Sequence, residues 1–309
     1  MVEESYKENY IRVQDDMQLY YREYGDIWSK KTPVLCLPGM TRNSKDFHNV
    51  ASWMARDRWV ICPDYRGRGK SDYDPNWKHY NAMTYIYDLM QLIIACNLKD
   101  IIVIGTSMGG LLSMGLNLVK PNLIKGLIIN DIGPTIASNG LGRIVNYIGV
   151  DKPKRSLEEA IDHLRTLFPN MALLSRAEWI EFATNTFRKK EDGLYHYDWD
   201  VNIAKAIRAE TGEMPDLWAM FRALKKIPLL VIHGEVSDIL NIDTVKEMHA
   251  VHPQMTSITI PNVGHAPTLN EIESRKALDL FFQNIEQNET GLFKKVLSFS
   301  DKTASLFSI

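Results

Sequence analysis

The fold of this chain is constrained most by short apolar runs that alternate with helical patterns. Between residues 33 and 134 the runs are VLCL, RWVIC, IIVIG and IKGLIIN, and helical segments separate them. In residues 81–97, for example, the apolar side chains recur with helical spacing and gather mostly on one side. Strands that are apolar throughout are typical of a parallel sheet covered by helices on both faces. The sequence therefore predicts an α/β fold with a mostly parallel central sheet.

One insertion interrupts this alternation. Residues 135–226 carry helical patterns and no convincing strand, and the strand–helix rhythm then resumes with IPLLVIHG. We therefore expect residues 1–134 and 227–287 to form one core, and residues 135–226 to form a helical cap or lid over it. Most of the aromatic side chains in this lid are expected to pack together, and some are expected to line an apolar acyl pocket.

The last residues, 288–309, form a C-terminal extension that mixes apolar side chains with lysines. Because its positive charge is small, we expect it to dock on protein. A homodimer contact and a contact with a membrane surface remain open for it.

Composition and charge limit the partners and the location of the protein. The formal net charge of −2 gives no support for nucleic acid as a main partner. The N-terminal residues are acidic and polar, unlike a secretory signal, and no apolar run reaches the about 20 residues of a membrane span. The three cysteines show no zinc-site spacing. These features predict a cytoplasmic protein that holds no metal and is not stably inserted in a membrane.

A serine stands where one apolar run ends and the next helix begins, in the motif GTSMG at residues 105–109. This strand–turn–helix setting is the one that a nucleophile elbow requires. The glycines fit such an elbow, because bulky side chains two residues from Ser107 would collide with the strand or the helix. The alternative is a serine that merely caps the helix, so the hypothesis depends on the partners of Ser107.

A serine nucleophile needs a base, and His265 is the predicted one. It lies in NVGHAP, directly after the last expected strand and before the last helix. The carboxyl end of a parallel strand is where active sites of such sheets form. His233, by contrast, lies inside an apolar strand and is expected to be structural.

Two aspartates could orient the imidazole of His265. Asp238 follows the run LLVIHG, and Asp131 follows the run LIIN, so both fit the chain order Ser, Asp, His. We favour Asp238, because its strand neighbours in sequence the strand that leads to His265. Asp131 is the alternative acid, although we expect it to cap or hydrogen-bond a loop beneath the lid.

An acyl-transfer site also needs backbone N–H groups for the oxyanion. One should come from Met108, the residue after the predicted nucleophile. The other should come from Met40, in the loop LPGMT that follows the first apolar run of the parallel sheet.

These pieces together resemble the α/β-hydrolase superfamily, in its lid-bearing branch of esterases, proline iminopeptidase-like proteins and C–C bond hydrolases. Five segments carry the resemblance: LPGM, PDYRGRGKSD, GTSMGG, GEVSD and NVGHAP. They occur in the order typical of the family and span residues 33–267. By this resemblance Arg66 and Ser71 are structural. Pro38 stands where the family often has histidine, and a serine nucleophile argues against epoxide hydrolase and haloalkane dehalogenase activity.

The residues and the resemblance predict a serine hydrolase, a carboxylesterase of the EC 3.1.1 kind. It would cleave a small-molecule acyl substrate, a carboxylic ester, through an acyl-enzyme without a metal or organic cofactor. C–C bond hydrolase, thioesterase, lactonase and acyltransferase activities with the same triad remain open, as does a non-catalytic ligand-binding receptor. We expect the rate to rise as the imidazole loses its proton, at about pH 6.5–7.

Overall fold

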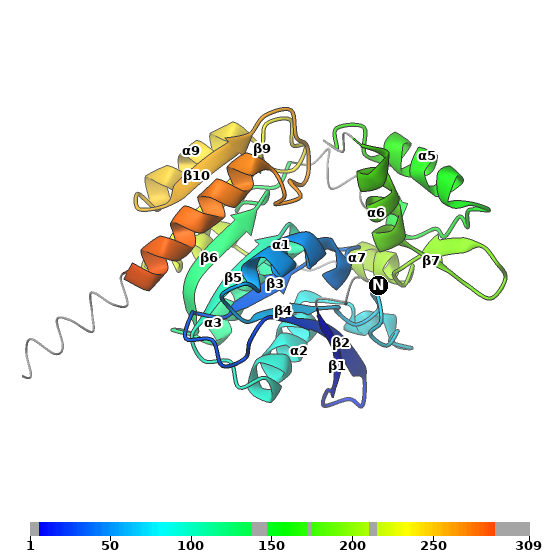
Figure 1. Ribbon diagram of the computed structural model, residues 1–309, viewed down its shortest axis with the longest axis horizontal. Helices are drawn as coiled ribbons and strands as arrows, with labels where there is room; N and C mark the ends of the chain where they lie inside the picture. Colours follow the sequence, from blue (N-terminus) through cyan, green and yellow to red (C-terminus); the bar gives the residue numbers. More distant parts are fainter. Residues whose placement is uncertain (1–5, 138–146, 172–174, 210–214, 288–309) are drawn as a thin grey trace, which may run out of the picture.

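The computed structural model describes residues 6–137, 147–171, 175–209 and 215–287 (Figure 1). Its centre is one large sheet, in which β3, β4, β5, β6 and β9 coincide with the apolar runs. The strands are β1 (Lys7–Arg12), β2 (Gln18–Tyr24), β3 (Val34–Leu37), β4 (Val60–Pro63), β5 (Ile101–Thr106), β6 (Ile124–Asn130), β9 (Leu229–Gly234) and β10 (Thr256–Ile260). The predicted C-terminal extension, 288–309, lies outside the described residues.

Within the described residues, the eight strands of this sheet follow the order β1-β2-β4-β3-β5-β6-β9-β10. Every pair from β4 to β10 is parallel, whereas β1 and β2 form an antiparallel hairpin whose inner strand pairs antiparallel with β4. The mostly parallel sheet predicted from the sequence is therefore confirmed. Successive residues alternate between two cores, with Leu35 and Leu37 on one face of β3, and Val34 and Cys36 on the other. Because both faces of the inner strands β3, β4 and β9 are buried, these strands are almost entirely apolar.

Helices cover both faces of the sheet. The helices that flank it are α1 (His48–Met54), α2 (Ala82–Ala95), α3 (Met108–Val119), α9 (Ile242–Val251) and a last helix at residues 272–287. The first and the last of these pack on one face, and the other three pack on the opposite face (Figure 1). No helix in the described ranges combines the length and apolarity needed to cross a membrane.

The insertion, residues 135–226, contains helices and one short hairpin. Its elements are α5 (Leu157–Leu167), α6 (Arg176–Thr186), β7 (Phe187–Lys189), β8 (Tyr195–Tyr197), α7 (Ile203–Ala209) and α8 (Leu217–Arg222). The expectation of no strand here was wrong, because β7 and β8 pair antiparallel. Each has three residues, too few for an alternating pattern to be recognised in the sequence.

Aromatic stacking holds this hairpin against the rest of the insertion. The ring of Tyr197 lies between those of Phe187 and Trp199, with centroid distances of 4.9 and 4.0 Å. Tyr147 meets Trp199 edge-on at 6.1 Å. As expected from the sequence, these aromatic side chains pack largely on one another.

Polar contacts tie the insertion to the loop that follows β3. The ammonium of Lys45 lies 2.8 Å from a carboxylate oxygen of Asp198, which is buried. The amide of Asn43 donates to the backbone carbonyl of Asn185 at 3.0 Å. The insertion is therefore fixed beside the carboxyl end of the sheet (Figure 1).

Arg66, which the resemblance marked as structural, is a buried hub of ion pairs. Its guanidinium donates to Asp88 at 2.6 and 2.7 Å, to Asp74 at 2.7 Å and to Asp15 at 2.6 Å. Burial acts to lower the pKa of Arg66, but the hydrogen bonds with these carboxylates outweigh it and raise the pKa. The hub joins the β1–β2 turn, the loop after β4 and helix α2 through one side chain.

Removing this cation tests its structural role. In the Arg66→Met variant, Asp74 and Asp88 stay buried without their partner, so we expect the free energy of unfolding at pH 7 to fall by about 3–5 kcal/mol. The deficit should shrink when the pH is lowered to about 3. Burial acts to raise the pKa of Asp74, but its hydrogen bonds lower it in the wild type, so the stability that this carboxylate contributes is lost as the pH falls through the lowered pKa. Burial raises the pKa of Asp88, so that carboxylate takes up its proton at a higher pH. Urea unfolding followed by circular dichroism at both pH values measures the difference.

Arg165→Met is the matched control, because Arg165 forms an exposed ion pair with Asp162 at 3.6 Å. Its loss should change the unfolding free energy by less than about 0.5 kcal/mol. Equal deficits for the two variants would contradict a structural role for the Arg66 hub.

Candidate active site

Ser107 lies at the sharp junction between β5 and α3. Its φ of 54° and ψ of −118° lie in a region that side chains other than glycine rarely adopt. The glycines around it permit close packing, since a Cβ on Gly109 would lie 2.1 Å from the carbonyl oxygen of Leu37. One on Gly105 would lie 2.5 Å from the carbonyl oxygen of Gly109. The steric reason predicted for this motif is therefore confirmed, and the Ser107 side chain projects from a tight elbow.

The structure brings His265 to Ser107. The Nε2 atom of His265 lies 2.9 Å from the Oγ of Ser107. His265 belongs to the loop between β10 and the last helix, and only 9% of its side chain is exposed. The geometry permits the imidazole to take the proton of the serine hydroxyl directly.

The partner of His265 is Asp131, which corrects the preference for Asp238. Its Oδ2 lies 2.8 Å from the Nδ1 of His265, and its side chain is fully buried. The physical reason is the strand order: β6, which ends just before Asp131, lies directly beside β5. Proximity in sequence favoured β9, but β9 lies one strand further from the elbow. Asp131, the alternative from the sequence, occupies the position expected for Asp238.

The Asp131 carboxylate is fully hydrogen-bonded inside the protein. Its Oδ1 accepts the backbone N–H of Gly234 at 2.8 Å, and its Oδ2 accepts the hydroxyl of Ser237 at 2.6 Å in addition to His265. A buried carboxylate requires such donors, because nothing else replaces its hydration. Ser237 was not predicted from the sequence, although it stands next to the favoured aspartate in GEVSD.

Asn130, also missed, ties the elbow to the loop that carries His265. Its side-chain amide donates to the carbonyl of Pro267 at 2.8 Å and to the hydroxyl of Thr106 at 3.1 Å. Its backbone carbonyl accepts the N–H of Ser107 at 2.9 Å. The only sequence signal was an uncharged polar residue at the end of an apolar strand. Asn130 thereby fixes the segments before Ser107 and after His265 relative to each other.

The loop predicted to complete an oxyanion hole lies beside the elbow. An added Cβ on Gly39 would lie 3.8 Å from the Cβ of Ser107, and Met40 lines the same cavity as Ser107. Met108 is the first residue of α3, so its N–H points out of the helix start. Among the described residues, neither N–H has a hydrogen-bond acceptor. Their role at an oxyanion remains a prediction.

Arg68 holds that loop in place from behind. It is fully buried, and its Nε donates to the carbonyl of Met40 at 2.8 Å. One Nη donates to the hydroxyl of Tyr85 at 2.6 Å, and the guanidinium carbon lies 4.7 Å from the centre of the same ring. The resemblance marked Arg66 and Ser71 in this segment as structural, but a role for Arg68 was not predicted. The sequence feature that could have indicated this role is the position of Arg68 between two glycines of the family motif.

Ser107 and His265 open into a cavity of about 420 Å³, within the usual range for small-molecule sites. The core supplies one wall. The insertion supplies the other, through Tyr147, Phe168, Met171, Glu178, Glu181, Phe182 and Asn185. Three of the aromatic residues noted in the sequence thus line the cavity, as expected for some of them.

Arg42 is the cation on this cavity wall among the described residues, and its charge is already paired. Its guanidinium lies 2.6 Å from both carboxylate oxygens of Asp46 and 4.4 Å from the centre of the Phe182 ring. A bidentate pair stacked on an aromatic ring is held rigidly. Arg42 therefore shapes the cavity, and no positive charge is left over there for an anionic substrate.

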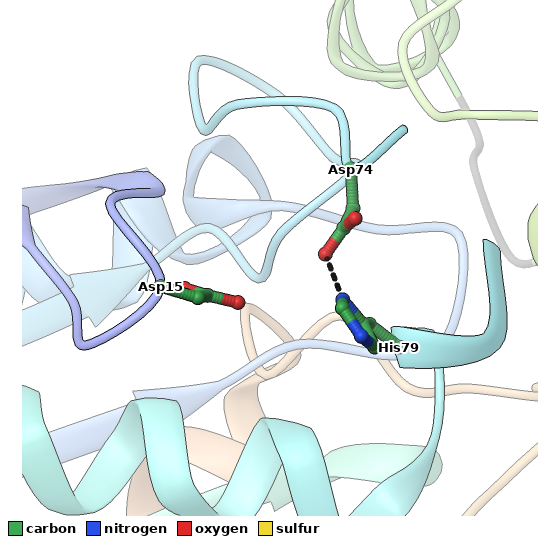
Figure 2. A group of neighbouring side chains, drawn as sticks. All are labelled: Asp15, Asp74 and His79. Atoms are coloured by element: carbon green, nitrogen blue, oxygen red, sulfur yellow. Dashed lines mark hydrogen bonds and ion pairs between the residues drawn. The ribbon is translucent and has the colours of Figure 1, made fainter. Parts of the chain in front are cut away.

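A second polar cluster, outside the cavity, has the residue types of a metal site. Asp15, Asp74 and His79 offer ligand atoms within 4.8 Å of one another (Figure 2). Both carboxylates already bind the guanidinium of Arg66, at 2.6 and 2.7 Å. A metal ion there would face that positive charge, so these residues fit the Arg66 hub better than a metal centre.

Comparison with known proteins identifies the family of this fold. Residues 32–271 match the family described as alpha/beta hydrolase fold. A 3-hydroxybutyrate-oligomer hydrolase from Cupriavidus necator is 33% identical over 259 residues, which are 81% of this chain and 88% of that relative. The sn-1-specific diacylglycerol lipase ABHD11 from Danio rerio is 34% identical over 243 residues, 76% and 73% of the two chains. A solved alpha/beta hydrolase from Novosphingobium aromaticivorans shares 37% identity at a TM-score of 0.86, covering 91% of this chain and 99% of that one. The chain belongs to the alpha/beta hydrolase family.

Proposed function

We propose that this hydrolase cleaves a small carboxylic ester through an acyl-enzyme, with Ser107, His265 and Asp131 as its catalytic triad. One observation carries the proposal: the Ser107 hydroxyl, the His265 ring and the Asp131 carboxylate form a continuous chain of contacts of 2.9 and 2.8 Å. This chain ends in a cavity of about 420 Å³. Nucleophile, base and orienting acid are the groups that acyl transfer requires.

The mechanism follows from the roles that these positions allow. Ser107 attacks the ester carbonyl while the Nε2 of His265 takes its proton. Asp131 keeps the proton on Nδ1 and stabilises the imidazolium that forms. The N–H groups of Met40 and Met108 receive the negative charge on the carbonyl oxygen. His265 then protonates the leaving alcohol, and a water molecule repeats the sequence to release the acyl group.

The cavity supports a short acyl chain that carries polar groups. Uncharged hydrogen-bonding side chains line it beside the aromatic ones, namely Thr41, Asn49, Thr106, Asn185, Thr268 and Asn270. Most of these groups are already hydrogen-bonded within the protein, for example Thr41 to Tyr147, Asn49 to Glu181 and Thr268 to Glu271. A long fatty chain would therefore gain less from this wall than from a purely apolar one. The relative named as a 3-hydroxybutyrate-oligomer hydrolase makes short hydroxyacyl esters the first substrates to test.

A fluorophosphonate probe tests the proposed nucleophile. It should label the folded wild-type protein at Ser107, and peptide mapping by mass spectrometry should locate the adduct. Ser107→Ala should abolish labelling. Ser113→Ala should not, although Ser113 is a buried serine of the same helix. Folded wild-type protein that resists the probe would refute the serine hydrolase and favour a non-catalytic receptor.

Two aspartate variants test the orienting acid. Asp131→Asn should lower kcat by about 10⁴-fold, because the amide stabilises the wrong tautomer of the imidazole. Asp238→Asn should keep kcat within a few-fold of the wild type. Steady-state kinetics on any ester that the wild type hydrolyses measures both. A larger loss from Asp238→Asn than from Asp131→Asn would restore the assignment favoured by the sequence.

A substrate panel tests the acyl preference. Among p-nitrophenyl esters, butyrate should exceed palmitate in kcat/KM by at least about tenfold, a difference of about 1.4 kcal/mol at the transition state. The dimer and trimer of 3-hydroxybutyrate should also be hydrolysed. Thioesters, lactones and C–C substrates with matched acyl groups serve as competitors, and faster turnover of any of them would replace the ester in the proposal.

A further inference from the structure

We propose that Ser237 is a positioning residue of this reaction: it holds the Asp131 carboxylate and limits how strongly that carboxylate binds the protonated imidazole of His265. The inference rests on the proposed triad. By this proposal, the hydroxyl of Ser237 helps to set the pH range in which the triad is active.

The basis is one shared oxygen atom. The Oδ2 of Asp131 lies 2.8 Å from the Nδ1 of His265 and 2.6 Å from the Oγ of Ser237. Two donors, the Ser237 hydroxyl and the His265 ring, therefore form hydrogen bonds with the same carboxylate oxygen. The other carboxylate oxygen, Oδ1, accepts the N–H of Gly234 at 2.8 Å and fixes the orientation of the group.

Backbone contacts decide which way the Ser237 hydroxyl points. The N–H groups of Ile239 and Leu240 both lie 3.2 Å from the Ser237 Oγ. Each of them donates into a lone pair of that oxygen, and a hydroxyl has two lone pairs and one proton. The remaining proton is therefore directed at Asp131. The N–H of Ser237 itself donates to the carbonyl of Gly234 at 3.0 Å, which closes the turn around the carboxylate.

The glycine that begins this turn allows the acid and the base to meet. A Cβ on Gly234 would lie 2.6 Å from the carbonyl oxygen of Val263 and 2.7 Å from that of Gly264. The segment that donates to Asp131 thus lies in direct backbone contact with the segment that carries His265. Because backbone hydrogen bonds hold Ser237 in this turn, its hydroxyl is kept in place beside Asp131.

Removing the hydroxyl should change the charge that His265 meets. Without Ser237, Oδ2 interacts with the imidazolium alone, and the ion pair formed after protonation becomes tighter. The protonated, inactive imidazole then persists to higher pH. The acid limb of the pH–rate profile should move upward, and kcat should fall because the carboxylate has lost one of its fixed donors.

Other charged groups near the triad stay constant in this comparison. Glu235, exposed in the same loop, accepts the N–H of Asn262, and Asp238 follows Ser237 directly. His233 on β9 contacts Thr259 and the carbonyl of Leu240. The charged residues that line the cavity with His265 are Arg42, Asp46, Glu178 and Glu181. None of these changes between wild type and Ser237 variants, so a moved midpoint reports the Ser237 hydroxyl.

The experiment is the rate of fluorophosphonate labelling of Ser107 between about pH 5 and 9, which needs no knowledge of the natural substrate. For Ser237→Ala we expect the midpoint of the acid limb to rise by roughly 0.5–1 pH unit, the size of effect that one hydrogen bond to a charged group produces. Ser237→Thr keeps the hydroxyl and should return the midpoint to the wild-type value. Ser237→Cys keeps the shape with a weaker donor and should give an intermediate midpoint.

Ser71→Ala is the matched control, because the Ser71 hydroxyl also donates to an oxygen, the backbone carbonyl of Asp64, and accepts the N–H of Tyr20. It should lower the melting temperature without moving the midpoint. A Ser237→Ala profile that overlays the wild type, at whatever rate, would overturn the inference. If Ser237→Ala does not fold, the Cys variant decides by the same criterion. Failure of the wild type to label at all would instead refute the proposed function.

Discussion

The parallel pairing of β5 with β6 is the interaction on which the rest of the site depends. Thr106 pairs with Asn130 at the end of this ladder, so Ser107 and Asp131 leave neighbouring strands at the same level. Both then adopt a positive φ, 54° and 56°. Each donates its backbone N–H to the next strand, Ser107 to the carbonyl of Asn130 and Asp131 to that of Ile232. The hydrogen-bond register of the sheet therefore places the proposed nucleophile and the proposed acid, and His265 lies between them.

The sequence was sufficient for the sheet, the serine and the histidine, and the physical reasons are visible in the structure. The apolar strands were evident because both of their faces are buried. Ser107 was evident because the positions two residues before and after it must be glycine: a Cβ there would lie only 2.5 and 2.1 Å from backbone oxygens. Such steric requirements leave a mark on the sequence wherever the backbone passes this closely.

The acid and the hairpin of the insertion could not be predicted in the same way. Asp131 and Asp238 both follow apolar strands, and only the strand order shows that β6 lies beside β5. The supporting contacts of Ser237, Asn130 and Arg68 involve single polar residues with no periodicity. The strands β7 and β8 are held by stacked rings, and stacking leaves no spacing signal over three residues.

The side chains around the cavity come from two parts of the chain, the core and the insertion. Ser107, His265 and Asp131 all come from the core, whereas the opposite wall comes from side chains of the insertion such as Tyr147, Phe182 and Asn185. One backbone hydrogen bond joins the two parts beside His265, from the N–H of Gly264 to the carbonyl of Asn170 at 2.9 Å. Substitution of side chains in the opposite wall would alter what fits against Ser107, while the side-chain hydrogen bonds of the proposed triad would stay in place. The insertion is therefore the part of the chain in which substitutions could change the fit of a substrate with the least effect on the proposed chemistry.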